Sequence, residues 1–290
     1  MAADAERRGD RPDRNRGRPA ARTARLFPDV HPSPAFVKIS VITVCRNAAG
    51  TIRDCIDSVA AQTHPDVEHW IIDGASTDGT AALLAELQKD RGFQFVSEPD
   101  GGLYHAMNKG LAKATGDVIG FLNADDWYAS PNVLAEVAEA LSDPAVAACY
   151  ANLQYVRQDD PGRVVRDWIA GPFEAGAFFR GWMPPHPTFF ARREVYQRWG
   201  GFDTRYRFGA DWELLFRLFE VAKIPVAYVP RHWITMRLGG ETNRSLRNIL
   251  TNHRECLSAF RQHGFRVGWI FPIRKVAHRL RQFRWRRPRN

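Results

Sequence analysis

An apolar run that stops at two adjacent carboxylates constrains this chain more than any other feature. Residues 118–122 read Val-Ile-Gly-Phe-Leu and are followed by Asn-Ala-Asp-Asp-Trp. This pattern predicts a buried strand of a parallel sheet, with Asp125 and Asp126 just past its carboxyl end. Ligands of open α/β sheets bind at that end of the strands. Because two neighbouring aspartates repel each other, the pair predicts a hard divalent cation, which would bring a phosphate with it.

The same two aspartates also allow a structural interpretation. They could be turn residues on the way to a helix that Ser130 caps and Pro131 opens. An isolated Asp-Asp pair fits both interpretations about equally, so the rest of the chain has to distinguish them.

Three further apolar runs precede this one, and helical patterns separate the runs. Strands are predicted at 38–44, 67–72 and 93–96, and helices from residue 51, at 81–89 and at 103–114. This order predicts a parallel sheet with helices on both faces. Asp73 then follows the second strand and Asp100 the third, so both share one rim with Asp125 and Asp126. Their convergence favours the functional interpretation.

The pattern changes in the second half of the chain. After a helix at 133–141 and a strand at 145–150, residues 152–190 alternate short apolar pieces with Gly and Pro. We interpret them as strands and long loops that select a substrate. A helix is predicted at 192–199, and another opens at Asp211. A carboxylate at the N-terminal end of a helix interacts favourably with the helix dipole, so Asp211 could instead be a simple helix cap.

The basic residues and the cysteines indicate where in the cell the protein would lie. The formal net charge is +9, and arginines crowd both ends of the chain. We expect residues 1–35 to form a disordered basic arm and residues 241–290 a helical basic tail. The four cysteines lack metal-ligand pairing, which fits a reducing compartment. Since no signal-peptide pattern and no apolar run of about 20 residues is found, we expect a cytoplasmic protein, either soluble or peripheral on the inner face of the cell membrane.

The rim has the groups that a nucleotide ligand needs. Asp73 can accept N–H bonds from the edge of a uracil, thymine or guanine. The Asp125/Asp126 pair can hold a divalent cation that neutralises a diphosphate. The glycines that follow Asp100 allow close backbone approach to an anion, and Lys109 could add a positive charge. Neither a P-loop nor a dinucleotide-binding glycine motif is found.

Four motifs in this order resemble those of family 2 glycosyltransferases, in particular bacterial members that build exopolysaccharides, lipopolysaccharides and glycolipids. They are SVITVCRN at 40–47, IDGASTDGT at 72–80, EPDGGLYHAMNKG at 98–110 and LNADD at 122–126. The resemblance covers about residues 37–220. It implies an α/β fold of the GT-A type, a nucleotide-binding domain with a mostly parallel central sheet flanked by helices. We expect this domain at 36–240, with the nucleotide-sugar half at 36–127 and the acceptor half at 128–240.

The resemblance also implies roles for individual residues. The nucleotide sugar would contact Asp73 through its base, and it would also contact Thr43, Asn47, Ser76, Asp100, Lys109 and Asp125. A divalent metal, Mn²⁺ or Mg²⁺, would bind Asp125 and Asp126; the family often has aspartate where this chain has Asn123. Asp211 resembles the catalytic base, although many relatives have an acid where this chain has Ala210. The implied reaction is a single displacement that inverts the anomeric carbon.

The predicted partners are a nucleoside-diphosphate sugar and a glycan or lipid-linked acceptor. His186 and Trp212 are candidates for the acceptor site, although a lone histidine is more often structural and a lone tryptophan more often core packing. A sugar-nucleotide pyrophosphorylase is the nearest alternative, and a non-enzymatic membrane or nucleic-acid binder is another. We expect no nucleic-acid partner, because a nucleic-acid binder would not need carboxylates at several strand ends. Docking of the basic tail on an anionic membrane suits a lipid-linked acceptor.

Overall fold

The computed structural model describes residues 37–239, 245–268, 270–280 and 282, which belong to one compact unit. The arm predicted at 1–35 and part of the tail predicted at 241–290 lie outside the described residues. The strands are β1 Ile39–Cys45, β2 Val67–Asp73, β3 Gln94–Ser97, β4 Val118–Phe121, β5 Trp127–Tyr128, β6 Ala148–Val156, β7 Val164–Trp168, β8 Phe190–Arg192 and β9 Val226–Arg237. The helices are α1 Ile52–Ala60, α2 Thr80–Arg91, α3 Leu103–Lys113, α4 Val133–Ala140, α5 Arg193–Trp199, α6 Ala210–Phe216, α7 Leu246–Gln262 and α8 Ile270–Leu280.

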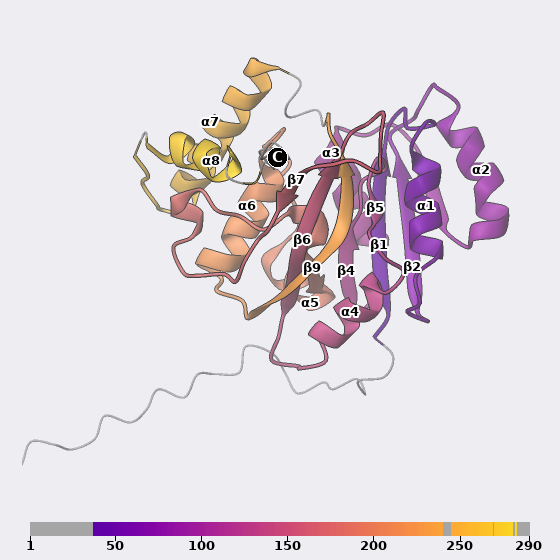
Figure 1. The fold of residues 1–290 in the computed structure, drawn as a ribbon, viewed down its shortest axis with the longest axis horizontal. Coiled ribbons are helices and arrows are strands. Elements are labelled where there is room, and N and C mark those ends of the chain that lie inside the picture. The colour runs from indigo at the N-terminus through magenta and orange to yellow at the C-terminus, as the bar shows by residue number, and fades with distance from the viewer. Residues whose placement is uncertain (1–36, 240–244, 269, 281, 283–290) are drawn as a thin grey trace, which may run out of the picture. The chain divides into compact units, whose positions relative to one another are not determined.

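The described strands form one mixed sheet in the order β3-β2-β1-β4-β8-β6-β9-β5, with β7 paired to β6 (Figure 1). The first four strands in this order are parallel, as the sequence predicts. β8 lies antiparallel between β4 and β6, and β6 pairs with β9 in parallel. The carboxyl ends of the first four strands therefore meet at one rim.

Side chains along β1 alternate between the two faces of the sheet, and different helices pack on each face. Ile39 and Val41 point into a core with α1 and α4, because successive side chains of a strand face opposite sides. Ile42 points to the other face, where α3 packs. A Cβ at Gly110 of α3 would lie 2.3 Å from Ile42 Cγ2, so only glycine allows this close contact.

The helix predicted at 133–141 is α4, which begins at Val133. The alternative, in which Ser130 caps the helix and Pro131 opens it, is wrong: Ser130 Oγ accepts a bond from the Asn132 backbone N–H (3.3 Å) and stabilises the turn before the helix. One strand boundary differs from the sequence prediction. β6 begins at Ala148 and extends beyond Tyr150, because it pairs with β9 along nine residues of its length.

An aromatic cluster joins the C-terminal helices to the rest of the unit. Trp212 and Phe216 of α6 pack against Phe260 of α7 and Phe271 of α8, with ring centroids 4.7–5.8 Å apart. Figure 1 shows α7 and α8 grouped beside α6, away from α1 and α2. Among the described residues, no helix is long and apolar enough to cross a membrane.

Candidate functional site

Asp73 lies at the end of β2, where the strand register aligns it with Cys45 of β1 and Ser97 of β3. Its carboxylate is buried and accepts bonds from the Ser76 backbone N–H (3.0 Å), the Ser97 hydroxyl (2.6 Å) and the Ser76 hydroxyl. Burial by itself raises the pKa of Asp73, but the bonds from Ser76 and Ser97 outweigh it and lower the pKa. Asp73 is thus an ionised group that orders the loop after β2.

Asp100 lies against the same strand end. A Cβ at Gly74 would come within 2.7 Å of Asp100 Oδ2, so a glycine is required beside this carboxylate. The other oxygen of Asp100 accepts a bond from the Gly102 backbone N–H (2.8 Å), at the start of α3. The fold therefore brings Asp73 and Asp100 together, as the strand order predicts.

Asn47 joins the first loop to the second. It has a positive φ of 55°, which asparagine tolerates better than most residues. Its backbone N–H donates to Ser76 Oγ (2.7 Å), and its side-chain Oδ1 accepts from the Thr77 backbone N–H (2.9 Å). Asn47 and Ser76 therefore lie side by side at the rim.

The structure corrects the expectation for Thr43. Its side chain is fully buried on the α1 face of β1, with Oγ1 3.0 Å from His69 Nε2 and 3.5 Å from Cys55 Sγ. Thr43 lies two residues before the end of β1. Its hydroxyl is part of the core and is not available to a nucleotide.

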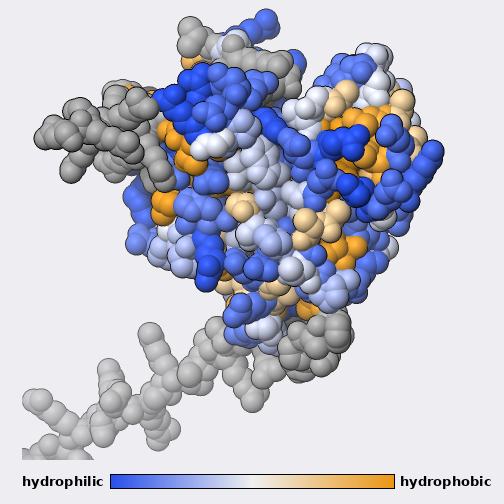
Figure 2. Space-filling view, turned by 45° about the vertical axis from the view of Figure 1, so that its right-hand side comes forward, coloured by the Kyte–Doolittle hydropathy of each residue, from blue (hydrophilic) through white to orange (hydrophobic). Residues whose placement is uncertain are grey.

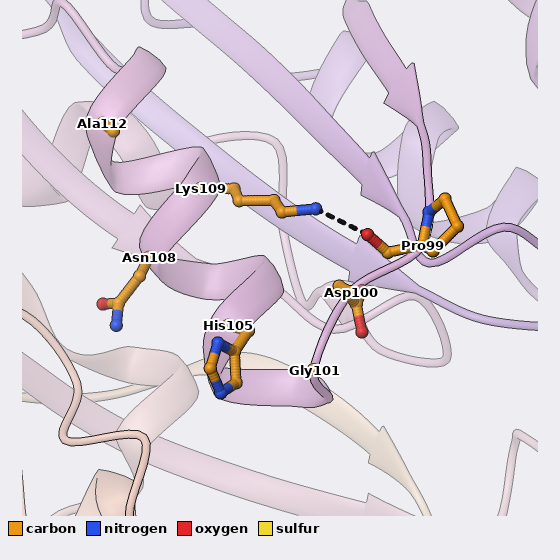
Figure 3. Close-up of a pocket in the computed structure, with 7 residues that line it drawn as sticks. All are labelled: Pro99, Asp100, Gly101, His105, Asn108, Lys109 and Ala112. Atoms are coloured by element: carbon orange, nitrogen blue, oxygen red, sulfur yellow. Dashed lines mark hydrogen bonds between the residues drawn. The ribbon is translucent and has the colours of Figure 1, made fainter.

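The Lys109 side chain binds the loop between β3 and α3. Its Nζ lies 2.8 Å from Glu98 Oε1 and donates to the Pro99 carbonyl (2.9 Å), and Figure 3 shows the side chain directed at that carbonyl. A cavity of about 660 Å³ lies along α3, lined by Pro99, Asp100, Gly101, His105, Asn108, Lys109 and Ala112. Lys109 holds the loop that carries Asp100, and its contact with phosphate stays a prediction.

The two carboxylates after β4 differ in environment. Asp126 is fully buried; its Oδ2 accepts a bond from Asn123 Nδ2 (3.0 Å), whereas its Oδ1 has no partner in the described part of the chain. Burial, followed by repulsion from Asp125, raises the pKa of Asp126 well above its usual range. Asp125 is only partly buried, and burial also raises its pKa.

The pair fits a divalent cation that takes its other ligands from substrate. Among the described residues, no group of three or more His, Cys, Asp or Glu side chains lies close enough together to bind one metal ion. Mg²⁺ and similar ions need only one or two protein carboxylates when diphosphate oxygens and water complete the shell. Asp125 supplies the accessible carboxylate, and the unpaired buried oxygen of Asp126 is a group that a cation or a proton would stabilise.

Arg237 holds the Asp125 loop, and the sequence reasoning missed it. Its guanidinium donates to the Asp125 carbonyl (2.8 Å), contacts the Asp54 carboxylate and lies 4.5 Å from the centre of the Trp127 ring. Arg237 ends β9, which pairs with β5 at Trp127. No local pattern could identify an arginine 112 residues away from Asp125.

Asp211 lies in the first turn of α6, where the N-cap residue is Gly209. The Tyr104 hydroxyl donates to Asp211 Oδ1 (3.2 Å), and the Tyr104 ring stacks on Phe202 at 5.5 Å. One turn further along α3, Asn108 donates to the Phe202 carbonyl (2.8 Å) and accepts from its N–H (2.9 Å). α3 therefore connects the Asp100 loop to Asp211. The i, i+4 spacing of Tyr104 and Asn108 was the available signal for this face.

His186 and Trp212 have different surroundings. His186 is 6% exposed, its ring lies 5.3 Å from Phe202, and its Nε2 has no partner among the described residues. Burial lowers its pKa, and the charge of Asp211 partly opposes that effect, so the imidazole is neutral near Asp211. Trp212 is 1% exposed and stacked on Phe216. This corrects the expectation that the Trp212 ring faces an acceptor.

The sheet order and the rim of carboxylates define an α/β nucleotide-binding domain of the GT-A type, which confirms the predicted fold. The sequence model of glycosyl transferase family 2 matches residues 40–200, over half of the chain, and the protein belongs to this family. It is accordingly a glycosyltransferase, as the sequence motifs predict.

Two curated relatives are mycobacterial. An uncharacterized glycosyltransferase of Mycobacterium tuberculosis is 34% identical over 184 residues, which are 62% of this chain and 68% of the relative. A PGL/p-HBAD biosynthesis glycosyltransferase of Mycobacterium bovis is 30% identical over 192 residues, 66% of this chain and 73% of the relative.

Two solved structures share the fold at low sequence identity. S. aureus TarS 1–349 in complex with UDP aligns with a TM-score of 0.56 and 16% identity, covering 77% of this chain and 65% of that one. The mannosyltransferase PcManGT from Pyrobaculum calidifontis, in complex with GDP-Man and Mn²⁺, aligns with a TM-score of 0.60 and 22% identity, covering 88% and 72%.

Proposed function

We propose that this glycosyltransferase moves a sugar from a nucleoside-diphosphate sugar to a hydroxyl of a glycan or glycolipid acceptor and inverts the anomeric carbon. The observation that carries the proposal is the bond from Tyr104 to Asp211. Tyr104 belongs to α3, whose first residues follow Asp100 at the nucleotide rim. One helix therefore links the donor side to a carboxylate that can act as a base.

Asp211 takes the proton of the acceptor hydroxyl while the oxygen attacks the anomeric carbon from the face opposite the diphosphate. Tyr104 orients the carboxylate through its hydrogen bond to Oδ1. Asp125, with Asp126 behind it, would hold a divalent cation, and the bound cation supplies positive charge where the diphosphate leaves. Arg237 keeps the Asp125 backbone in place.

The donor is a sugar linked to UDP, GDP or dTDP in this proposal. Asp73 and Asp100, which the fold brings together after β2 and β3, would bind the base, and solved structures that share the fold contain UDP, UDP-GlcNAc or GDP-Man. Asn47 and Ser76, which bond each other at the rim, would contact the nucleoside.

The test is nucleotide binding with and without metal. In a thermal-shift screen against UDP-, GDP- and dTDP-sugars, one nucleotide class should raise the melting temperature by about 5 °C at 100 times its Kd when Mn²⁺ or Mg²⁺ is present. Asp125→Asn should remove the metal-dependent part of this shift. Asp90→Asn, an equal change of charge at an exposed site on α2, should not.

Two results would contradict the proposal. One is the same shift in wild type and Asp125→Asn, which would show that this carboxylate holds no metal for the donor. The other is consumption of a nucleoside triphosphate with release of pyrophosphate, which would indicate a pyrophosphorylase. A transferase releases nucleoside diphosphate instead.

For the acceptor side we propose a peripheral contact between α8 and an anionic membrane. Ile270, Ile273 and Val276 are 44%, 57% and 43% exposed, whereas Phe271 on the opposite side of the helix is buried. On the face that Figure 2 shows, apolar patches lie among hydrophilic residues, the most extended of them at the upper right. An exposed apolar helix face with arginine in the same helix is typical of interfacial helices.

Vesicle co-sedimentation tests this contact. Ile273→Glu should reduce binding to vesicles with anionic lipid about tenfold, because it places a negative charge on the apolar face. Val221→Glu, at a 39% exposed site after α6, should bind like wild type. Equal losses in the two variants, or wild-type binding to neutral vesicles alone, would contradict the proposal.

A further inference from the structure

A second cavity lies beside the helix that carries Asp211. Its volume is about 370 Å³, and it is lined by Arg207, Phe208, Arg247, Asn248 and Thr251. Arg207 and Phe208 precede α6, and the other three residues lie in the first two turns of α7. Both arginines are exposed. Phe208 directly precedes Gly209, the N-cap residue of α6, so the cavity lies at the end of the helix where Asp211 occupies the first turn.

The backbone under Arg207 is fixed to α7. The two carboxylate oxygens of Glu255 accept bonds from the Arg207 N–H (3.0 Å) and the Phe208 N–H (2.8 Å). Asn252 Nδ2 donates to the Phe208 carbonyl (2.8 Å). A Cβ at Gly209 would lie 3.2 Å from Glu255 Cβ, so the loop and helix are tightly packed. These bonds fix the backbone that carries Arg207 to α7, the helix that carries Arg247, so the two residues belong to one packed unit beside α6.

The cavity combines two positive charges with no acidic lining residue. The nearest acid on the same helix face, Glu255, uses both oxygens for backbone N–H groups. Neither arginine forms an ion pair with a described carboxylate. The Thr251 hydroxyl donates to the Arg247 carbonyl (2.9 Å), so it stiffens this turn of α7. Arg207 Cζ lies 5.2 Å from the centre of the Phe208 ring, a contact that uses the face of the guanidinium rather than its N–H groups. Two exposed guanidinium groups on one cavity suit a phosphate, which each can bind through two parallel N–H bonds.

We propose that this cavity binds a phosphate group of the acceptor, so that the acceptor is a phosphorylated molecule whose hydroxyl lies at Asp211. The proposal rests on the proposed function for the role of Asp211. The phosphate can come from a soluble polyol or sugar phosphate, or from a lipid-linked phosphate. Both present the same anionic group to Arg207 and Arg247, and the size of the rest of the molecule distinguishes them.

Calorimetric titration of the full chain with two probes tests the cavity. The probes are glycerol 1-phosphate, which represents a soluble acceptor, and a short-chain 1-acyl lysophosphatidic acid, which has the same phosphate and a free hydroxyl and represents a lipid-linked one. UDP or GDP, whichever the protein binds, is kept saturating with Mn²⁺ so that the donor site is filled. Arg207→Gln and Arg247→Gln should each weaken binding of the preferred probe about tenfold, the effect of one lost charge-assisted hydrogen bond.

Arg254→Gln is the matched control, because Arg254 is an exposed arginine further along α7 and not part of the cavity. Its binding should equal that of wild type. Equal weakening in all three variants would mean a general charge effect, and no binding of either probe to wild type would mean that the cavity takes no phosphate; each overturns the proposal. If no nucleotide binds, the titration is run without it; a probe that binds wild type and is weakened by Arg207→Gln and Arg247→Gln would then leave the phosphate site standing while the proposed function fails.

Discussion

Asp211→Asn should lower sugar transfer by about a thousandfold and leave binding of the nucleotide sugar unchanged. Asparagine has nearly the same shape and can still accept the Tyr104 bond, but it cannot take the proton of the acceptor hydroxyl. General-base catalysis contributes about 10²–10⁴ to a rate. The measurement is release of nucleoside diphosphate with an envelope extract as the source of acceptor, beside calorimetric binding of the donor.

Two further variants make this result specific. Tyr104→Phe keeps the stacking on Phe202 but removes the bond to Asp211, so we expect about a tenfold loss of transfer with unchanged donor binding. Asp203→Asn is the control, because its carboxylate pairs with Arg205 at 2.6 Å and lies outside the proposed site. If Asp203→Asn lowered transfer as much as Asp211→Asn, the assignment of the base would be wrong.

The parallel half of the sheet could be predicted because its signals are local. An apolar run that ends in polar residues marks each of β1, β2 and β4. Parallel strands end at the same rim, so Asp73, Asp100 and Asp125 could be placed near one another before any contact was known. The family motifs add the GT-A fold, which the comparisons confirm.

The contacts that complete the site could not be predicted, because they join distant segments. Tyr104 and Asp211 are 107 residues apart, and Arg237 and Asp125 are 112 residues apart. Nothing local in the sequence specifies either pair. Glu255, which fixes the loop before Asp211, belongs to a helix for which the sequence predicted only helical and basic character.

Thr43 and Trp212 show a second limit of sequence reasoning. Each residue lies in or next to a sequence motif that has proposed functional positions. The motif does not show which face of the strand or helix the side chain occupies. In β1 the side chain at 43 faces α1, two residues before the rim. In α6 the residue after Asp211 is turned by about 100° around the helix axis, which directs Trp212 into the aromatic cluster.

Trp212→Ala should therefore destabilise the fold by about 3–5 kcal/mol, the cost of deleting a large buried side chain. The indole is 1% exposed and has Phe216 and Phe260 within 5.1 Å between ring centroids, so its removal leaves a cavity between α6 and α7. Trp212→Phe keeps an aromatic ring in place and should cost less than half as much. Chemical denaturation of both variants measures the change in unfolding free energy.

Trp199→Ala is the control for loss of a tryptophan, since Trp199 is only partly buried and its ring contacts Arg198 rather than the cluster. It should cost about 1 kcal/mol. The opposite pattern, in which Trp212→Ala unfolds like wild type and loses only acceptor binding, would return Trp212 to the acceptor site. The cluster also joins α7 to α6, so when Trp212→Ala unfolds, Glu255 no longer binds the loop that positions Asp211. Sugar transfer and donor binding should therefore both fall to the fraction of the variant that stays folded.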